Sequence, residues 1–261
     1  MKIAIIMPAY NEEKRIGKTL ESYLQFFSAL PQRKKIYWEL LVVINGTTDN
    51  TEKIVIIHEK TNKNLKHIVL EKGGKGFAIT EGFKKYLKTD FGFIGFVDAD
   101  LATYPAEYFK LIEEIEEYDG VIANRYDRDS KIINGQGFRR IIISRVFNFL
   151  VRSLFLIPYE DTQCGAKIFK REAVKKILDD LTITKWAYDV NLLYACKKNN
   201  LRIKSVPTVW YDTTGSKLNV NKVSVQMFFA IVQLRIMNSP FRRILKIFTP
   251  AIKAIYKFVG G

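Results

Sequence analysis

The stretch Phe93-Ile94-Gly95-Phe96-Val97-Asp98-Ala99-Asp100 decides the fold. Its first five residues form an apolar run that is too short for a helix, which predicts a buried strand over 93–97. Open α/β folds bind their ligands at the carboxyl ends of such strands. Because residues i and i+2 of a strand point the same way, we expect Asp98 and Asp100 to hold one Mg²⁺ or Mn²⁺ together and to leave positions open for diphosphate oxygens. The alternative for an isolated Asp-x-Asp is a solvated acidic turn.

Strand-like and helix-like segments alternate along the chain. The expected strands are 3–7, 39–44, 67–70, 93–97, 120–123, 167–169 and 203–206. The expected helices lie between them, at 14–30, 51–60, 76–87, 107–118, 139–155, 172–178 and 187–197. This alternation predicts an α/β fold, with a mixed, mostly parallel sheet and helices on both of its faces.

The positive charge of the chain is unevenly placed. The net charge is +15, and most of the excess lies in two segments without any acid, 130–159 and 213–261. Both segments are apolar with helical spacing, which predicts amphipathic helices that lie in a membrane surface with basic residues at the headgroups. We assign this contact to Arg139, Arg140, Arg145, Arg242 and Arg243. The alternatives are a helix that packs on the sheet for 139–155, and dimerisation for the tail beyond 240.

Compartment and membrane topology follow from the remaining composition. Cys164 and Cys196 match no metal or disulfide spacing, which suits a reducing compartment. The chain enters its first expected strand directly after Met1, and its longest apolar run, 223–234, is too short to span a bilayer. We therefore expect a cytoplasmic protein that is peripheral on the cytoplasmic face of a membrane, without a transmembrane helix. No nucleic-acid-binding module is recognisable.

Four segments occur in a fixed order: Pro8-Ala9-Tyr10-Asn11-Glu12, Asn45-Gly46-Thr47-Thr48-Asp49-Asn50-Thr51, Lys72-Gly73-Gly74-Lys75-Gly76 and Asp98-Ala99-Asp100-Leu101-Ala102-Thr103. With them the chain resembles the family 2 glycosyltransferases over about residues 1–220, which implies a Rossmann-like GT-A domain there. The charge and apolar spacing of residues 221–261 predict a basic amphipathic helical tail after it. Three further segments make the chain most similar to the polyprenyl-phosphate or dolichyl-phosphate glucosyl- and mannosyltransferases. They are Asp161-Thr162-Gln163-Cys164-Gly165-Ala166-Lys167, Trp186-Ala187-Tyr188-Asp189-Val190 and Gly215-Ser216-Lys217.

The resemblance implies a nucleotide-sugar site. Its residues would be Pro8, Tyr10, Glu12, Asn45, Lys75, Asp98, Ala99 and Asp100. The chain departs from its relatives at Ile44-Asn45, where they commonly have two acids. An amide both donates and accepts hydrogen bonds, which suits the edge of uracil better than that of guanine and favours a UDP-sugar over GDP-mannose. The glycine-rich loop around Lys75 suits a phosphate but lacks P-loop spacing, which argues against ATP hydrolysis.

The reaction implied by the resemblance is inverting transfer of a hexose to a polyprenyl or dolichyl phosphate. Lys217 would reach the diphosphate, and Arg125 the sugar or the phosphates. A phosphate acceptor is already ionised near neutral pH, so it needs positioning more than a general base. We place Asp161 and Asp189 on the acceptor side, and the alternative for each is a helix cap or a buried salt bridge.

The sequence argues against two other enzyme classes. A nucleotidyltransferase should begin with Gly-x-Gly-Thr-Arg, and a processive synthase should carry Gln-x-x-Arg-Trp and several spanning helices; the sequence has neither pattern. Two alternatives stay open, a glycosyltransferase that acts on a glycan hydroxyl and a non-catalytic membrane-surface module. A homodimer and a membrane-protein partner also stay open.

Overall fold

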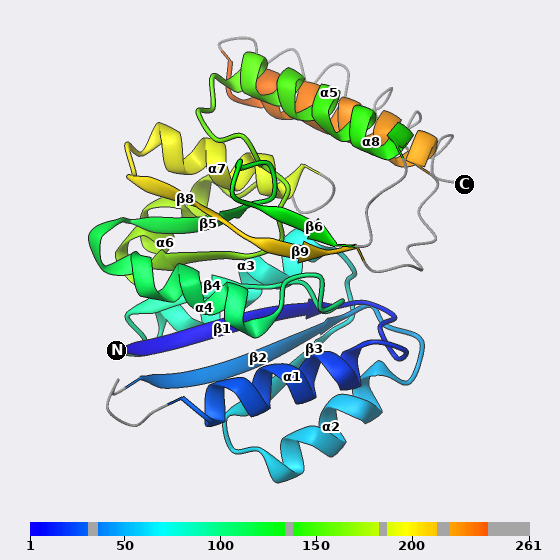
Figure 1. The fold of residues 1–261 in the computed structure, drawn as a ribbon, viewed down its shortest axis with the longest axis vertical. Helices are drawn as coiled ribbons and strands as arrows, with labels where there is room; N and C mark the ends of the chain where they lie inside the picture. Colours follow the sequence, from blue (N-terminus) through cyan, green and yellow to red (C-terminus); the bar gives the residue numbers. More distant parts are fainter. Residues whose placement is uncertain (31–35, 134–137, 183–186, 213–219, 240–261) are drawn as a thin grey trace.

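The computed structural model describes residues 1–30, 36–133, 138–182, 187–212 and 220–239, with the backbone alone at 138–143 and 220–225. Seven strands of this part form one central sheet (Figure 1). In spatial order they are β3 (Leu65–Leu70), β2 (Tyr37–Asn45), β1 (Lys2–Ala9), β4 (Phe93–Phe96), β7 (Lys167–Lys170), β5 (Gly120–Asn124) and β8 (Ile203–Pro207). Neighbouring strands are parallel except at β7, which runs antiparallel to β4 and β5. The predicted mixed, mostly parallel sheet is confirmed.

Helices cover both faces of this sheet. On β1, Ile3, Ile5 and Met7 pack into one core and Ala4 and Ile6 into the other, as expected for a strand buried on both faces. The first core is covered by α1 (Ile16–Ser28), α2 (Thr51–Thr61) and α4 (Pro105–Glu114). The second is covered by α3 (Lys75–Leu87), α6 (Arg171–Ile177) and α7 (Tyr188–Lys198). Short 3-10 turns, Ile115–Glu117 and Leu178–Asp180, extend α4 and α6.

Two long helices form a third layer. Helices α5 (Phe138–Phe155) and α8 (Val220–Met237) lie side by side, at the end of the molecule opposite α1 and α2 (Figure 1). Their buried side chains form a third core with α7, made by Val151, Phe155, Val190, Leu193, Ile231 and Leu234 among others. Within the described ranges, no helix is both long enough and apolar enough to cross a membrane.

The structure adds a small element that the sequence pattern does not predict. Strands β6 (Lys131–Ile133) and β9 (Val209–Tyr211) pair in parallel as a separate two-stranded ribbon. A strand of three residues is too short to show a period, and long-range contacts hold this one. The buried Glu107 carboxylate of α4 accepts the Val209 N–H at 2.8 Å and the Thr208 hydroxyl at 3.3 Å.

Candidate functional site

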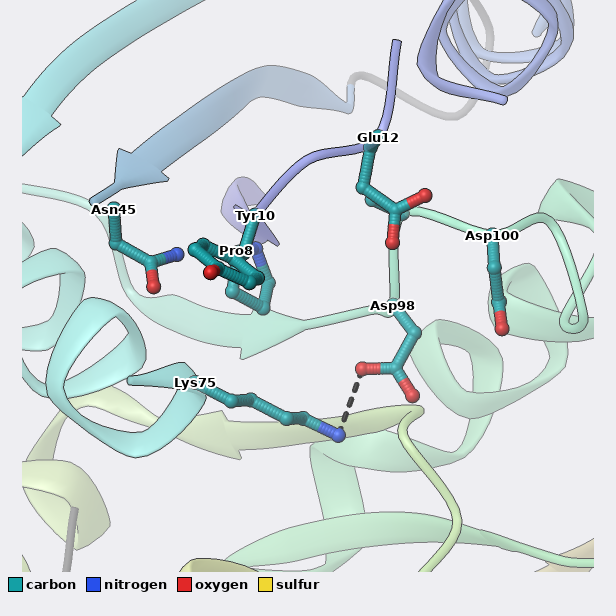
Figure 2. Close-up of a pocket in the computed structure, with 8 residues that line it drawn as sticks. Pro8, Tyr10, Glu12, Asn45, Lys75, Asp98 and Asp100 are labelled. Atoms are coloured by element: carbon teal, nitrogen blue, oxygen red, sulfur yellow. Dashed lines mark ion pairs between the residues drawn. The ribbon is translucent and has the colours of Figure 1, made fainter. Parts of the chain in front are cut away.

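A pocket opens at the carboxyl ends of β1, β2 and β4, beside the first turn of α3 (Figure 2). It is lined by Pro8, Tyr10, Glu12, Asn45, Lys75, Asp98, Ala99 and Asp100. These are the residues that the sequence analysis assigns to nucleotide-sugar binding, and the fold brings all of them together. In Figure 2 the carboxyl groups of Glu12, Asp98 and Asp100 gather at one end of the pocket, whereas Pro8 and Asn45 lie at the other.

A turn, not a strand, presents the paired carboxylates. Strand β4 ends at Phe96, so the expectation that strand alternation aligns Asp98 with Asp100 is wrong. The buried Thr19 hydroxyl of α1 donates a hydrogen bond to the Ala99 carbonyl at 2.8 Å and anchors this turn. The Ala102 N–H donates to Asp100 Oδ1 at 3.0 Å. Both carboxylates still line the pocket.

The segment before β7 packs against this turn. A Cβ placed on Gly165 would lie 1.9 Å from Oδ2 and 2.3 Å from Cγ of Asp98. A glycine is therefore required at position 165 if the Asp98 carboxylate is to keep its position. The sequence shows Gly165 within a motif but gives no sign of its contact, because the contact joins residues that are distant in the chain.

Burial and neighbouring carboxylates raise the pKa of Asp100 and of Glu12. Burial, followed by the charge of Asp98, raises the pKa of Asp100 above its ordinary value. Burial also raises the pKa of Glu12, although Arg15 pairs with both of its oxygens at 2.7 Å and opposes that shift. Asp98 and Asp100 contribute further to the rise at Glu12. A bound cation would relieve this repulsion.

Asp98 and Asp100 fit a divalent cation that shares a diphosphate. Among the described residues, no group of three or more His, Cys, Asp or Glu side chains is placed to hold a metal ion by itself. Mg²⁺ is typically bound through one or two carboxylates together with substrate phosphates, and Mn²⁺ also prefers oxygen ligands. Two carboxylates that open on a pocket match this donor set.

A row of alternating charges leads from the pocket into the protein. Lys75 Nζ lies 2.7 Å from Asp98 Oδ1 and 3.6 Å from Asp189 Oδ2, and Lys167 Nζ lies 2.6 Å from Asp189 Oδ1. Burial opposes the charge on Lys75, but the carboxylates of Asp189 and Asp98 outweigh it and raise the lysine's pKa. Burial likewise opposes ionisation of Asp189, yet Lys167 and Lys75 hold its pKa below the ordinary value. Asp189 is therefore an ion-pair partner in this structure.

Asp161 and Arg125 form a second buried ion pair. Arg125 donates from Nε and Nη2 to the two oxygens of Asp161, at 2.7 and 2.9 Å. Burial would raise the pKa of Asp161, but Arg125 and several backbone N–H groups lower it. The N–H groups of Gln163 and Cys164 donate to Asp161 Oδ1, both at 3.1 Å. The pair thus orders the loop that ends at Gly165.

Asn45 uses its side chain to join strands to the glycine-rich loop. Its amide nitrogen donates to the carbonyls of Ala9, at 2.9 Å, and Val43, at 3.3 Å. Its amide oxygen accepts the N–H of Gly74 at 2.8 Å. Both N–H groups are thus engaged by the backbone, so the donor that the sequence argument offers to uracil is already used. These hydrogen bonds hold the shape of the pocket. They also position Lys75, because Lys75 directly follows Gly74 in the loop.

Five of the predicted site residues have side chains outside the described part of the chain. Lys217, Arg242 and Arg243 lie outside the described residues, and Arg139 and Arg140 lie where only the backbone of α5 is described. Arg145 is exposed on α5, and its guanidinium carbon lies 4.0 Å from the centre of the Tyr126 ring.

Lys167 is a site residue that the sequence analysis leaves without a role. It is completely buried in β7 and neutralises Asp189. A signal for it exists, because a lysine at the start of an apolar, buried strand requires a buried acidic partner. Thr19 and Gly165 carry no comparable signal.

Comparisons with protein families and with individual proteins agree with the family resemblance of the sequence motifs. A family model described as glycosyl transferase family 2 matches residues 4–178. The dolichyl-phosphate beta-glucosyltransferase of Dictyostelium discoideum is 31% identical over 243 residues, which cover 89% of this chain and 73% of that protein. The Homo sapiens protein of the same name is 29% identical over 228 residues, which cover 83% and 69% of the two chains.

Solved structures share the fold. The glucosyl-3-phosphoglycerate synthase of Mycobacterium tuberculosis, in complex with Mn²⁺, uridine diphosphate and phosphoglyceric acid, superposes with a TM-score of 0.67 at 18% identity. The match covers 90% of this chain and 78% of that one. The same enzyme in complex with Mn²⁺ and UDP-glucose gives a TM-score of 0.66 at 17% identity, over 92% and 80% of the chains.

Proposed function

Because the chain belongs to glycosyl transferase family 2, we propose that it transfers glucose from UDP-glucose to dolichyl phosphate. The observation that carries the proposal is the pocket in which Asp98, Asp100 and Lys75 meet at the carboxyl ends of the strands. The names of the relatives support the sugar and the lipid. Support for UDP comes from the solved structures of the same fold that contain UDP or UDP-glucose. It does not come from Asn45, because the amide of Asn45 is engaged with the backbone.

In this proposal the pocket holds the donor with its nucleotide beside Pro8, Tyr10 and Asn45 and its diphosphate beside Asp98 and Asp100. Mg²⁺ or Mn²⁺, held by the two aspartates, would supply Lewis-acid stabilisation of the charge that grows on the leaving diphosphate. Lys75 adds a positive charge at the same end of the pocket. The acceptor attacks from the face opposite the diphosphate, which inverts the configuration of the sugar carbon.

The charges around Asp189 favour a phosphate acceptor over a sugar hydroxyl. A hydroxyl must lose its proton to a general base, and an effective base has a pKa near the working pH. Lys167 and Lys75 hold the pKa of Asp189 below its ordinary value, which makes it a poor base. A phosphate monoester needs no such base. We propose that Asp189 aims Lys75, and that the Arg125–Asp161 pair holds the loop of residues 161–165 beside the acceptor.

We further propose that α5 and α8 form the surface that contacts the membrane. Val146, Phe149 and Phe228 are exposed on these helices, with Phe149 69% exposed, and Leu156, which directly follows α5, is 73% exposed. Exposed Arg145, Arg152 and Arg235 lie on the same helices. Apolar side chains beside arginines suit the boundary between acyl chains and anionic headgroups. In this proposal α8, the first part of the tail 221–261, acts together with α5 at the lipid surface.

The reaction is tested with purified protein, Mg²⁺ or Mn²⁺, a short-chain dolichyl phosphate, and UDP-glucose, UDP-GlcNAc or GDP-mannose in turn. We expect an extractable lipid-phosphate glucose from UDP-glucose, and a rate about 10²–10³-fold lower for Asp98→Asn. Asp90→Asn is the matched control, because Asp90 is an exposed aspartate that pairs with Lys2 at the amino end of β1, away from the pocket at the carboxyl ends of the strands. Nucleotide release without a lipid product would contradict the proposed acceptor.

Membrane contact is tested by co-sedimentation with vesicles of neutral lipid, with and without phosphatidylserine. Burial of a phenylalanine side chain contributes about 1.5–3 kcal/mol, so Phe149→Ser should weaken binding by about tenfold or more. Ile57→Ser is the control, because Ile57 is 64% exposed on α2, at the opposite end of the molecule (Figure 1). Equal binding by the two variants would refute the assignment of α5 to the lipid surface.

A further inference from the structure

Lys75 contributes a positive charge to the lining of the pocket. Its ammonium group lies 2.7 Å from Asp98 Oδ1, and the contact is drawn in Figure 2. The two side chains are 35% and 37% exposed, so this ion pair lies where a solute can reach it. A divalent cation bound through Asp98 Oδ1 would compete with Lys75 for that oxygen, and like charges so close repel strongly.

Asp189 offers the ammonium group a second partner. Its Oδ1 is held by the buried Lys167 at 2.6 Å, while its Oδ2 faces Lys75 at 3.6 Å. Lys167 is itself fixed, because it also donates to the Cys164 carbonyl. Rotation about the flexible side chain of Lys75 can thus exchange Asp98 for Asp189 while the ammonium group keeps a carboxylate partner.

We propose that Lys75 is a resident counter-ion that keeps a divalent cation off Asp98 until a nucleotide diphosphate accompanies it. When both arrive, Lys75 moves toward Asp189 and the diphosphate, and the cation takes its place at Asp98. The inference rests on the proposed function for its two ligands. It agrees with the donor set, since the described residues hold no cluster that binds a metal ion without help from a ligand.

The test measures Mn²⁺ binding by the full chain, without acceptor lipid, from the electron paramagnetic resonance signal of free Mn²⁺. Titrations are carried out with and without UDP. Without UDP, we expect Lys75→Met to bind Mn²⁺ about tenfold more tightly than the wild type. We also expect UDP to increase the Mn²⁺ affinity of this variant less than that of the wild type. Lys75→Arg keeps the charge and should stay close to the wild type.

Lys72→Met is the matched control, because Lys72 is an exposed lysine of the same loop whose ammonium lies 5.3 Å from the centre of the Phe77 ring. If Lys75→Met binds Mn²⁺ no more tightly than the wild type, or if Lys72→Met gains as much, the inference is overturned. Lys75→Gln is a second neutral variant with the same expectation, should the methionine variant fold poorly. The proposed function is judged separately, by the lipid-linked product of the wild type.

Discussion

Replacement of Gly165 by alanine should damage the site while it leaves the fold in place. The new Cβ would lie 1.9 Å from Asp98 Oδ2, whereas real Cβ atoms stay at least 3.0 Å from such neighbours. The carboxylate or the loop must therefore move by about 1 Å, a displacement that can reduce a rate by about 10²-fold. Overpacking of this kind costs about 1–3 kcal/mol of unfolding free energy, which the domain should survive.

The assay compares Gly165→Ala with Gly92→Ala, an alanine substitution just before β4. No heavy atom lies within 4 Å of the Cβ position at Gly92, so this control should keep wild-type turnover and melting temperature. For Gly165→Ala we expect kcat/KM for UDP-glucose to fall about 100-fold and Mn²⁺ affinity in the presence of UDP to fall with it. Circular dichroism checks that the variant is folded.

A folded Gly165→Ala protein with wild-type turnover and wild-type Mn²⁺ affinity would show that the position of the Asp98 carboxylate does not depend on Gly165. The close contact between Gly165 and Asp98 would then have no effect on the reaction.

Three further predictions concern the contacts that hold the site. Asp161→Asn leaves Arg125 buried beside a neutral amide and should lower the unfolding free energy by about 3–5 kcal/mol, measured by urea denaturation. The pKa of Asp161 is lowered in the folded state, so its stabilisation is complete above the ordinary aspartate value of about 3.9 and is lost as the pH falls through the folded-state value. The unfolding free energy, measured as the pH is lowered, should show this loss in the wild type and not in Asp161→Asn. The same pH dependence in both proteins would contradict the prediction. Asn45→Ala leaves the Gly74 N–H without its partner and should lower the unfolding free energy by about 1–3 kcal/mol. UDP binding, measured by calorimetry, should weaken, and unchanged binding would count against a positioning role for Asn45. Thr19→Val keeps the side-chain volume but removes the donor to the Ala99 carbonyl, and it should likewise cost about 1–3 kcal/mol in urea unfolding, whereas an unaffected midpoint would mean that the turn is held by other contacts.

The central α/β layers could be predicted from local patterns, and the residues of the pocket from the family resemblance. Apolar runs such as Phe93–Phe96 mark buried strands, and the residues that follow them meet at one edge of a sheet whatever the details of packing. The resemblance assigned Pro8, Asn45 and Asp98 to one nucleotide-sugar site, and all three line the same pocket. The antiparallel course of β7 between β4 and β5 has no local signature, because strand order is set by the packing of whole elements.

The sequence by itself determined which chemistry the chain carries, through motifs that each act within a few residues. The tertiary structure alone decided which charges are paired: Lys75 with Asp98, Lys167 with Asp189, and Arg125 with Asp161. It also placed Gly165 on the Asp98 carboxylate and engaged the Asn45 amide with the backbone. The physical reason is that an ion pair or a close contact depends on distance in space, and these partners are brought together only when the sheet and its helices have packed.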